Sequence, residues 1–392
     1  MRRHLGTLAL TTALLAAGPA RGEEELPLRV LSFNAWGIWM VSPAREARIE
    51  AMGPAIAALA PDVVAMQEVW VDEDAERLAD ALARAGLPHS QRFYSTWPGN
   101  SGLLIASRYP IERAEFVEYA EGTYPDIPWH VDWLAGKGMA RVRLRTPAGP
   151  VDVASTHVQA AYGSRRYELI QLSQLLEGAE FLEGSDDVPL IVAGDLNVGC
   201  DSLPYRAFAQ RLDLRPTDPE CGIDSISVRG GGGRDLAVWG VRKVLDTPVR
   251  LSDGSEQRLS DHDGLVADLT LRPGHVAPAR ISTAARWLDV TREALGRIYT
   301  HRTLLSRHQL RDIVLAGAML QVALLLLVVW RKQRPTNLAL RRPLAALATA
   351  ALAAGLWFGY LGASYAPKHM AELNQVRQRL ESALSAGMLG AR

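Results

Sequence analysis

The chain has 392 residues, 48% of them hydrophobic, and its 43 Lys and Arg residues balance 43 Asp and Glu residues. The balance hides a division, because residues 27–272 carry 24 basic and 35 acidic residues whereas residues 273–392 carry 16 basic and 5 acidic residues. An acidic first part repels a polyanion, so the composition disfavours a nucleic acid as partner. It does not exclude one, because composition leaves room for local basic patches. A zwitterionic group meets no such repulsion.

The first 22 residues have the pattern of a secretory signal. Residues 1–4 include two arginines, residues 5–18 form an apolar run, and Ala20 or Gly22 supplies a small residue for cleavage. An amphipathic first helix is the alternative, but the segment has no polar face. We therefore expect residues 1–22 to direct export of the chain.

Short apolar or alternating runs in the next part of the chain predict strands, and each has polar side chains beside one end. These strands are residues 28–33 before Asn34, 63–66 before Gln67 and Glu68, 151–154 before Thr156 and His157, 189–193 before Asp195 and Asn197, and 265–269 after Asp261 and His262. Helical patterns between the strands are clearest at residues 46–59, 73–85 and 167–182. We expect an α/β domain over residues 27–272, with a two-layered sheet, helices outside and the polar groups at one rim.

A linker and a basic stretch follow this domain. Residues 273–278 mark the linker, and over residues 279–311 Arg recurs at intervals of roughly five with apolar residues between. Those apolar residues are Ile281, Trp287, Leu288, Leu295, Ile298, Leu304 and Leu305. Residues 273–310 are thus expected to be a linker and a basic amphipathic helix, which would lie in the headgroup layer of a bilayer. A solvated spacer helix is the alternative.

Two apolar runs near the C-terminus approach the roughly 20 residues that cross a bilayer. We expect spans at residues 311–330 and 344–363, with a polar tail over residues 364–392. The intervening residues 331–343 hold five Lys and Arg residues, which places that loop in the cytoplasm and the first domain on the opposite, periplasmic or extracellular face. A buried helical hairpin of a soluble protein is the alternative.

The polar groups at the strand ends suit metal-assisted hydrolysis of a phosphoester. A hard cation needs oxygen ligands, the attacking water needs a general base, and the phosphoryl oxygens need hydrogen-bond donors. Each residue alone is equally typical of an ordinary turn, a solvated loop or a satisfied histidine. Their joint occurrence in this order favours a catalytic site.

The order and identity of these stretches resemble the endonuclease/exonuclease/phosphatase superfamily over roughly residues 28–271, and within it the neutral sphingomyelinase branch. The closer resemblance is carried by residues 33–38 (Phe-Asn-Ala-Trp-Gly-Ile), 67–70 (Gln-Glu-Val-Trp), 102–103 with 107–110, and 132–137 (Asp-Trp-Leu-Ala-Gly-Lys). The membrane-bound members also have two hydrophobic segments. The resemblance implies a four-layered α/β sandwich, two central β-sheets flanked by helices, followed by a two-helix transmembrane hairpin.

The resemblance also implies a metal site that binds Mg²⁺, with Mn²⁺ as an alternative. Glu68 would be the main ligand, with Asn34 beside it and Asp261 near the metal. Asp132 and Lys137 would contact the phosphoryl group or gate the site, although an Asp and a Lys in a Gly-containing loop are usually solvent-exposed charges.

The catalytic roles follow in the same way. His262 would be the general base, Asp195 and Asn197 would position the water and the phosphoryl group, and His157 would donate to a phosphoryl oxygen. Asp235 stands where the family has an Arg-x-Asp-Tyr-like motif whose Asp orients the base. The motif is degraded here, since Gly233 replaces the Arg and Leu236 the aromatic residue.

Tryptophans and cysteines add two further expectations. Trp36, Trp70 and Trp133 fall in the loops expected around the site and suit a choline-type cation or a bilayer interface, as do Trp39, Trp97 and Trp129. Cys200 and Cys221 are the only cysteines and, in an exported chain, favour a disulfide that would stabilise the fold by roughly 3 kcal/mol. Neither has the spacing of a zinc site.

The function expected from these observations is a membrane-anchored, Mg²⁺-dependent sphingomyelin phosphodiesterase that releases phosphocholine and leaves ceramide in the bilayer. A nuclease, a phosphatase or a phosphodiesterase for another substrate within the same superfamily is the alternative. A non-catalytic membrane adaptor is a third, against which the complete residue set argues. The lipid bilayer is the expected partner, and the oligomeric state stays open.

Overall fold

The computed structural model describes residues 25–96, 100–120, 130, 132, 135–162, 167–183, 187–274, 281–333 and 338–390. The expected signal at residues 1–22 lies outside these ranges, as do Trp97, Trp129 and Trp133 and most of the linker. The side chains of residues 281–287, Trp287 among them, are likewise not described.

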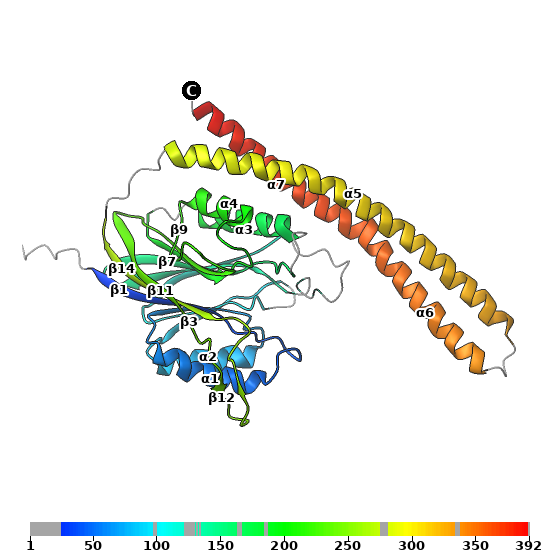
Figure 1. Cartoon of the computed structure of the whole chain (residues 1–392), viewed down its shortest axis with the longest axis horizontal. Helices are drawn as coiled ribbons and strands as arrows, with labels where there is room; N and C mark the ends of the chain where they lie inside the picture. The colour runs from blue at the N-terminus through cyan, green and yellow to red at the C-terminus, as the bar shows by residue number, and fades with distance from the viewer. Residues whose placement is uncertain are drawn as a thin grey trace, which may run out of the picture.

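Two six-stranded sheets stack face to face (Figure 1). The first has the order β11-β14-β1-β2-β4-β3, with β1 Leu26–Asn34, β2 Val63–Gln67, β3 His89–Arg92, β4 Leu104–Ser107, β11 Arg234–Val244 and β14 Gly264–Pro273. The second has the order β5-β6-β7-β8-β10-β9, with β5 Ile111–Glu118, β6 Gly138–Thr146, β7 Gly149–His157, β8 Leu190–Asp195, β9 Arg215–Pro216 and β10 Asp224–Arg229. A small hairpin pairs β12 Val249–Arg250 with β13 Glu256–Gln257.

Strand periodicity explains how the layers are filled. Successive side chains of a strand point to opposite faces, and in β1 Leu28 and Val30 enter the core between the sheets whereas Leu31 and Phe33 face outward under helices. Both faces of this central strand are therefore apolar and buried. Its polar end, Asn34, lies where the layers stop and is also buried.

Helices cover the outer faces of both sheets. Helices α1 Arg45–Ala58 and α2 Asp72–Arg84 pack on the first sheet, and α3 Glu168–Leu182 and α4 Leu203–Leu212 cover the second (Figure 1). The arrangement is the expected four-layered sandwich. The helices expected at residues 46–59, 73–85 and 167–182 each begin and end within one residue of the observed bounds.

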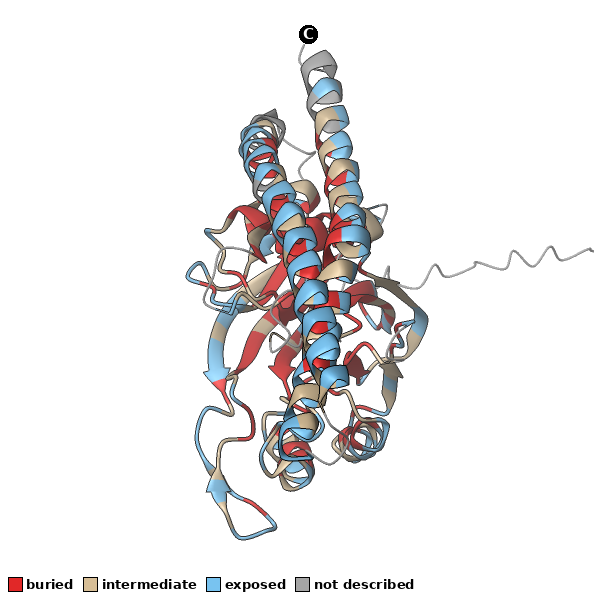
Figure 2. Ribbon diagram, turned by 90° about the vertical axis from the view of Figure 1, so that its right-hand side faces the viewer, coloured by how far each residue is buried: buried red, intermediate tan, exposed pale blue. Residues whose placement is uncertain are grey.

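Two long apolar helices leave this domain and run side by side. Helix α5 spans Ile281–Lys332, and α6 Leu338–Tyr360 runs back along it (Figure 1). A short π-helix, Leu361–Tyr365, then continues α6 into α7 Ala366–Gly390. Their length and composition suit two membrane spans. Only 11% and 22% of the residues in their most apolar windows are buried, and Figure 2 shows mostly exposed residues along them, which argues against a buried hairpin.

Small residues let these helices approach closely. A Cβ atom added to Gly355 would lie 3.0 Å from the Leu320 side chain, and one added to Gly362 would lie 2.8 Å from Ile313. Close backbone approach through glycine is typical of helix pairs in membranes.

Described apolar side chains of the basic stretch pack on the domain, whereas contact of the stretch with a headgroup layer stays a prediction. Leu295, Ile298 and Leu305 of α5 are buried in one apolar cluster with Leu172 of α3 and Leu203 of α4. Leu373, Val376 and Leu380 of α7 complete the cluster, so the expected polar tail also docks on the domain. The apolar stripe of a basic helix fits another protein surface as well as it fits lipid, and here helices α3 and α4 supply that surface.

Candidate active site

Sheet topology brings the polar strand ends to one rim. Strands β1 and β2 are parallel, with Asn34 opposite Gln67, and β7 and β8 are parallel, with His157 opposite Asp195. Strand β14 runs antiparallel to β1, so its start, which follows His262, reaches the same rim. Since the two sheets are stacked, their rims together form one site.

Asn34 joins the two sheets at this rim. Its Nδ2 atom donates to Glu68 Oε1 at 2.9 Å and to Asp195 Oδ2 at 3.0 Å, and its Oδ1 atom accepts the Trp36 N–H at 2.9 Å. The side chain is fully buried. The orientation of the amide is thereby fixed between the two carboxylates.

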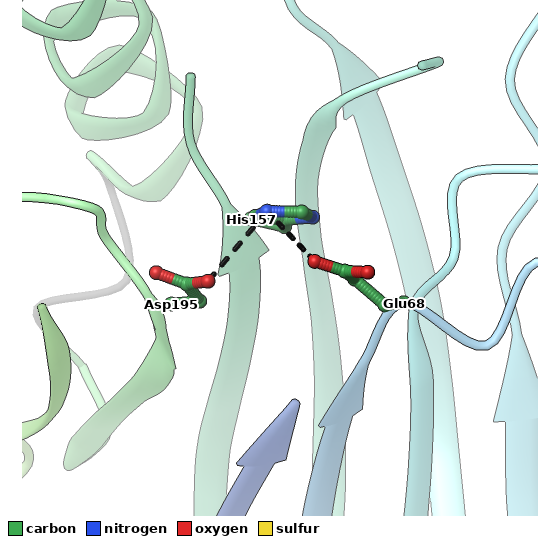
Figure 3. Close-up of side chains that lie close together, drawn as sticks. All are labelled: Glu68, His157 and Asp195. Carbon is green, nitrogen blue, oxygen red and sulfur yellow. Dashed lines mark ion pairs between the residues drawn. The ribbon is translucent and has the colours of Figure 1, made fainter. Parts of the chain in front are cut away.

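Glu68, His157 and Asp195 converge beside Asn34. The His157 ring lies between the two carboxylates, with Nε2 3.8 Å from Glu68 Oε1 and 3.6 Å from Asp195 Oδ2 (Figure 3). Glu68 has a left-handed backbone with φ of 57°, a strained conformation that is common at functional sites. Among the described residues, no hydrogen-bond partner meets Glu68 Oε2, although the atom is buried.

The donor set fits a hard divalent cation. Burial raises the pKa of Glu68, and the nearby Asp261 charge raises it further, while Asn34 and Lys137 only partly offset these effects. Burial followed by the Asp224 charge raises the pKa of Asp195. A cation beside the Glu68 Oε2 atom would offset the repulsion between these carboxylates and favour their ionised forms. Oxygen ligands suit Mg²⁺. In the part of the chain that the structure describes, two groups bring possible ligand atoms within 4.8 Å of one another and could hold a metal ion: Glu68, His157 and Asp195, and Asp195, Asp224 and His262.

Asp224, not Asp235, lies behind the expected base. His262 Nδ1 is 2.8 Å from Asp224 Oδ2, and its Nε2 is 3.7 Å from Asp195 Oδ2. Burial lowers the pKa of His262, but the Asp224 hydrogen bond and the surrounding carboxylates outweigh it and raise the pKa to about 9. The carboxylate holds the ring in one orientation, as a second group behind a general base should.

The expectation for Asp235 is wrong because of the direction of its strand. Val244 at the end of β11 pairs with Gly264, near His262, whereas Asp235 pairs with Arg272 at the opposite end of β14. There its carboxylate accepts from Arg215 at 2.7 Å and from Arg272 at 3.4 Å. A local signal for Asp224 existed: an acid opens the alternating run Ser225-Ile226-Ser227-Val228, which predicts another strand.

Asn197 stands in a tight turn after β8. Its N–H donates to Asp195 Oδ1 at 3.0 Å, its Nδ2 donates to the Val158 carbonyl at 2.9 Å, and its φ is 52°. The turn geometry proposed as the ordinary alternative is therefore present. This turn also places Asn197 beside Asp195, one of the candidate catalytic residues.

Lys137 is buried against His157 and is not a solvated charge. Its Nζ lies 2.9 Å from His157 Nε2 and 3.0 Å from Asp132 Oδ2, and donates to the Val158 carbonyl at 2.7 Å. Burial and the Lys137 charge lower the pKa of His157 well below its usual value, so the ring is neutral. Asp132 in turn accepts the Ala160 N–H at 2.6 Å. This linkage brings Asp132 and Lys137 to the site.

Tryptophans surround the rim in different ways. The Trp70 ring lies 6.2 Å from His157 and packs on Gly102, where an added Cβ would lie 3.0 Å from the ring. The Trp36 ring lies under the Arg48 guanidinium, 4.9 Å away. Both are partly buried, so packing accounts for much of each side chain.

Arg48 is a residue near the site that the sequence did not reveal. Its fully buried guanidinium donates to the carbonyls of Ala35, Trp36 and Leu259, at 3.1, 2.8 and 2.6 Å. It therefore ties the loop after Asn34 to the loop before Asp261. An arginine on a helix is usually solvated, so nothing in the local pattern marks this one.

A disulfide joins two of the site loops. Cys200 and Cys221 are bonded, with their Cα atoms 5.6 Å apart. The bond links the segment after Asn197 to the segment before Asp224, and the Leu196 N–H donates to the Ile223 carbonyl at 2.8 Å beside it. The cross-link restrains two loops that carry candidate catalytic carboxylates.

Known proteins are similar in sequence to part of this chain. A Drosophila melanogaster protein named "Putative neutral sphingomyelinase" is 31% identical over 63% of this chain and 61% of its own length. An inositol phosphosphingolipids phospholipase C of Schizosaccharomyces pombe is 35% identical over 47% of this chain and 44% of its own length. The chain thus matches less than two thirds of the length of either relative.

Solved structures and a family model point the same way. The beta toxin of Staphylococcus aureus superposes with a TM-score of 0.50 at 18% identity, covering 61% of this chain and 99% of the toxin, which shows a shared fold. The model of the Endonuclease/Exonuclease/phosphatase family matches residues 31–262, more than half of the chain, and contains every candidate catalytic residue. The chain belongs to the Endonuclease/Exonuclease/phosphatase family.

Proposed function

We propose that the chain is a membrane-anchored sphingolipid phosphodiesterase that depends on a divalent cation, Mg²⁺ first, and cleaves sphingomyelin to ceramide and phosphocholine. The observation that carries the proposal is the convergence of Glu68, His157 and Asp195 with the paired Asp224 and His262 at one rim. This rim holds a candidate cation site and a candidate base side by side. Hydrolysis of a phosphodiester needs both.

His262 is the proposed general base. Its Nδ1 faces Asp224, so Nε2 is left to take a proton from water. The Asp224 hydrogen bond and the nearby carboxylates raise the pKa of His262 to about 9, and a positive charge beside these carboxylates would bring it towards neutrality, where an imidazole is an effective base. Asp195 and Asn197 border the space in which water and phosphoryl group would meet.

Glu68 and Asp195 would hold the cation, with Asn34 fixing the two carboxylates. A bound Mg²⁺ supplies positive charge for the non-bridging oxygens and the departing alkoxide. Lys137 adds a fixed ammonium group 2.9 Å from His157 Nε2, the ring atom that also faces the two carboxylates. We propose that Lys137 and the Nδ1–H of His157 donate to phosphoryl oxygens.

The choice of headgroup rests on charge and on the relatives. The domain over residues 27–272 is acidic, which favours zwitterionic phosphocholine over a polyanion such as DNA. An inositol phosphosphingolipid is the second candidate, because one relative is named for that substrate. Both share the sphingolipid phosphodiester and differ beyond the phosphate.

Membrane anchoring is proposed from the helices. Helices α5 and α6 would cross the bilayer, and the basic residues between them would stay in the cytoplasm. Helix α7 packs on α5 and its residues join the cluster beneath α3, so the C-terminus and the catalytic domain share a side. The domain would then act on the non-cytoplasmic leaflet.

The test is a side-by-side assay of the full chain. Vesicles with sphingomyelin, vesicles with inositol phosphosphingolipid, plasmid DNA and a soluble phosphodiester would each be offered with Mg²⁺ and with chelator. We expect phosphocholine release from sphingomyelin that stops with chelator. Cleavage of DNA alone would establish the nuclease alternative, and no turnover of any substrate would favour the adaptor.

A further inference from the structure

Three consecutive large apolar side chains stand in solvent beside the site. Trp39, Met40 and Val41, here called the apolar tip, have exposed fractions of 66%, 82% and 63%. They lie in the middle of the loop between β1 and α1, residues 35–44. Single exposed apolar residues are normal, but a contiguous group of this kind marks an interaction surface.

The tip is held by a defined backbone. The N–H groups of Val41 and Ser42 donate to the Ile38 carbonyl at 3.3 and 3.1 Å, and the Ile38 N–H donates to Ser42 Oγ at 3.0 Å. Arg48 closes the base of the loop, because it binds the carbonyls of Trp36 before the tip and Pro43 after it. The tip is therefore presented at a fixed place relative to Asn34.

The position of the loop points to lipid. In Figure 1 the loop between β1 and α1 projects from the end of the domain at which β1 stops, on the side towards which α5 and α6 extend. The same end holds Asn34, Glu68 and Asp195. A bilayer crossed by α5 and α6 would face this end of the domain.

Charge around the tip indicates the kind of surface. An open hollow of about 990 Å³ beside Trp39 and Met40 is lined by three arginines and four acidic residues. One of the arginines, Arg45, is paired with Asp74. This near balance gives no excess positive charge for anionic lipid, so contact would rely on apolar insertion, and Trp prefers the interface of a bilayer.

We propose that the apolar tip inserts into the interfacial layer of a zwitterionic bilayer and holds the rim of the site against the membrane. The inference rests on the proposed lipid substrate and on membrane anchoring. It adds a second point of contact, on the loop that follows Asn34. Two contacts, the helices and the tip, would fix the tilt of the domain.

Lipid contact is measured without reference to catalysis. Both native cysteines form the disulfide, so Trp39→Cys gives one labelling site for a polarity-sensitive fluorophore in the full chain. Trp239→Cys is the matched control, because Trp239 is 72% exposed on the edge strand β11. In phosphatidylcholine–sphingomyelin liposomes we expect blue-shifted emission and quenching by brominated lipid at position 39 and not at position 239.

Activity provides the second readout. The double change Trp39→Ser with Met40→Ser should lower the ratio of vesicle hydrolysis to hydrolysis of a soluble phosphocholine ester by roughly tenfold, since two large apolar groups no longer enter lipid. Trp239→Ser should leave that ratio unchanged. Added salt or anionic lipid should change the difference between the variants little, because the contact is apolar.

The outcomes separate this inference from the proposed function. Sphingomyelin hydrolysis with an unquenched label at position 39 would overturn the inference and leave the function standing. Quenching at position 39 in a protein that cleaves no sphingolipid would overturn the proposed function and leave the bilayer contact standing. Quenching that requires a second, labelled copy of the chain would make the tip a self-association surface and overturn the bilayer contact.

Discussion

At the scale of single residues, the proposed chemistry depends on which acid stands behind His262. Asp224 is 2.8 Å from His262 Nδ1, whereas Asp235 is occupied by Arg215 and Arg272 at the other end of its strand. Asp195 lies on the opposite side of the ring, 3.7 Å from Nε2. The ring is thus held between a partner that orients it and a carboxylate of the candidate cation site.

His262→Ala should lower kcat by about 10²–10⁴, the usual contribution of a general base, with little effect on folding. Asp224→Asn should lower kcat by roughly 10²–10⁴ as well, because the amide no longer fixes the tautomer. The Asp224 bond raises the pKa of His262, so its loss should also move the acidic limb of the pH–rate profile to lower pH. Asp235→Asn is the control, and an equal loss in that variant would contradict the assignment.

Glu68→Gln should weaken cation binding and activity together. The amide lacks the negative charge that holds a hard cation, and the buried Glu68 Oε2 atom meets no hydrogen-bond partner among the described residues. Mn²⁺ binding followed by electron paramagnetic resonance gives a readout independent of turnover. Glu46→Gln, on the exposed first turn of α1, should bind Mn²⁺ as the unaltered chain does. Superimposable titrations for the two variants would remove Glu68 from the site.

At the scale of elements, helices α5 and α7 form part of the domain surface. Their leucines and valines share an apolar cluster with α3 and α4, and Arg379 of α7 pairs with Glu180 of α3 at 2.9 Å. Ending the chain after Arg272 would uncover Leu169, Leu172 and Leu176 of α3. Removal of the tail therefore affects stability as well as delivery to lipid.

Leu373→Ala should destabilise the docked helices by about 2–5 kcal/mol, because a buried leucine leaves a cavity. Arg379→Ala should cost at most about 1 kcal/mol, since both partners of its ion pair are more than a third exposed. Hydrogen exchange of α3 in the full chain would report the difference. Equal protection of α3 in Leu373→Ala and in the unaltered chain would mean that α7 does not dock in solution.

At the scale of the whole molecule, the path of the chain sets its topology. Helix α5 leaves the domain, α6 returns, and α7 packs again beside the domain (Figure 1). The two ends of the hairpin therefore lie on one side of any membrane that both helices cross. The basic residues that end α5 and begin α6, Arg331, Lys332, Arg341 and Arg342, lie at the far end of the helix pair (Figure 1).

A reporter inserted within residues 334–337 should be cytoplasmic, and one fused after Arg392 should be outside, because basic loops are retained in the cytoplasm. Protease protection in sealed vesicles would check both positions. A reporter fused to a chain without residues 1–22 is the control for export. A cytoplasmic C-terminus in the full chain would contradict both the hairpin and the expected signal.

Local pattern was sufficient for much of the fold. The alternation of residues 28–33 and the helical patterns from residues 46, 73 and 167 predicted β1, α1, α2 and α3 to within two residues, because side-chain periodicity is a property of neighbouring residues. The gathering of Asn34, Glu68, His157 and Asp195 at one rim followed from their shared position at strand ends. The apolar length of residues 311–330 and 344–363 was likewise visible in the chain itself.

Contacts between side chains from distant segments of the chain could be read only from the tertiary structure. Whether Asp224 or Asp235 meets His262 depends on the direction and register of β10, β11 and β14, which come from sheet pairing between segments far apart in the chain. Whether the apolar face of α5 meets lipid or α3 depends on a surface that another segment supplies. Local pattern thus predicted the strands that end at the rim, three of the helices and most of the chemical types there. The assembled sheets and helices decided which of those groups touch.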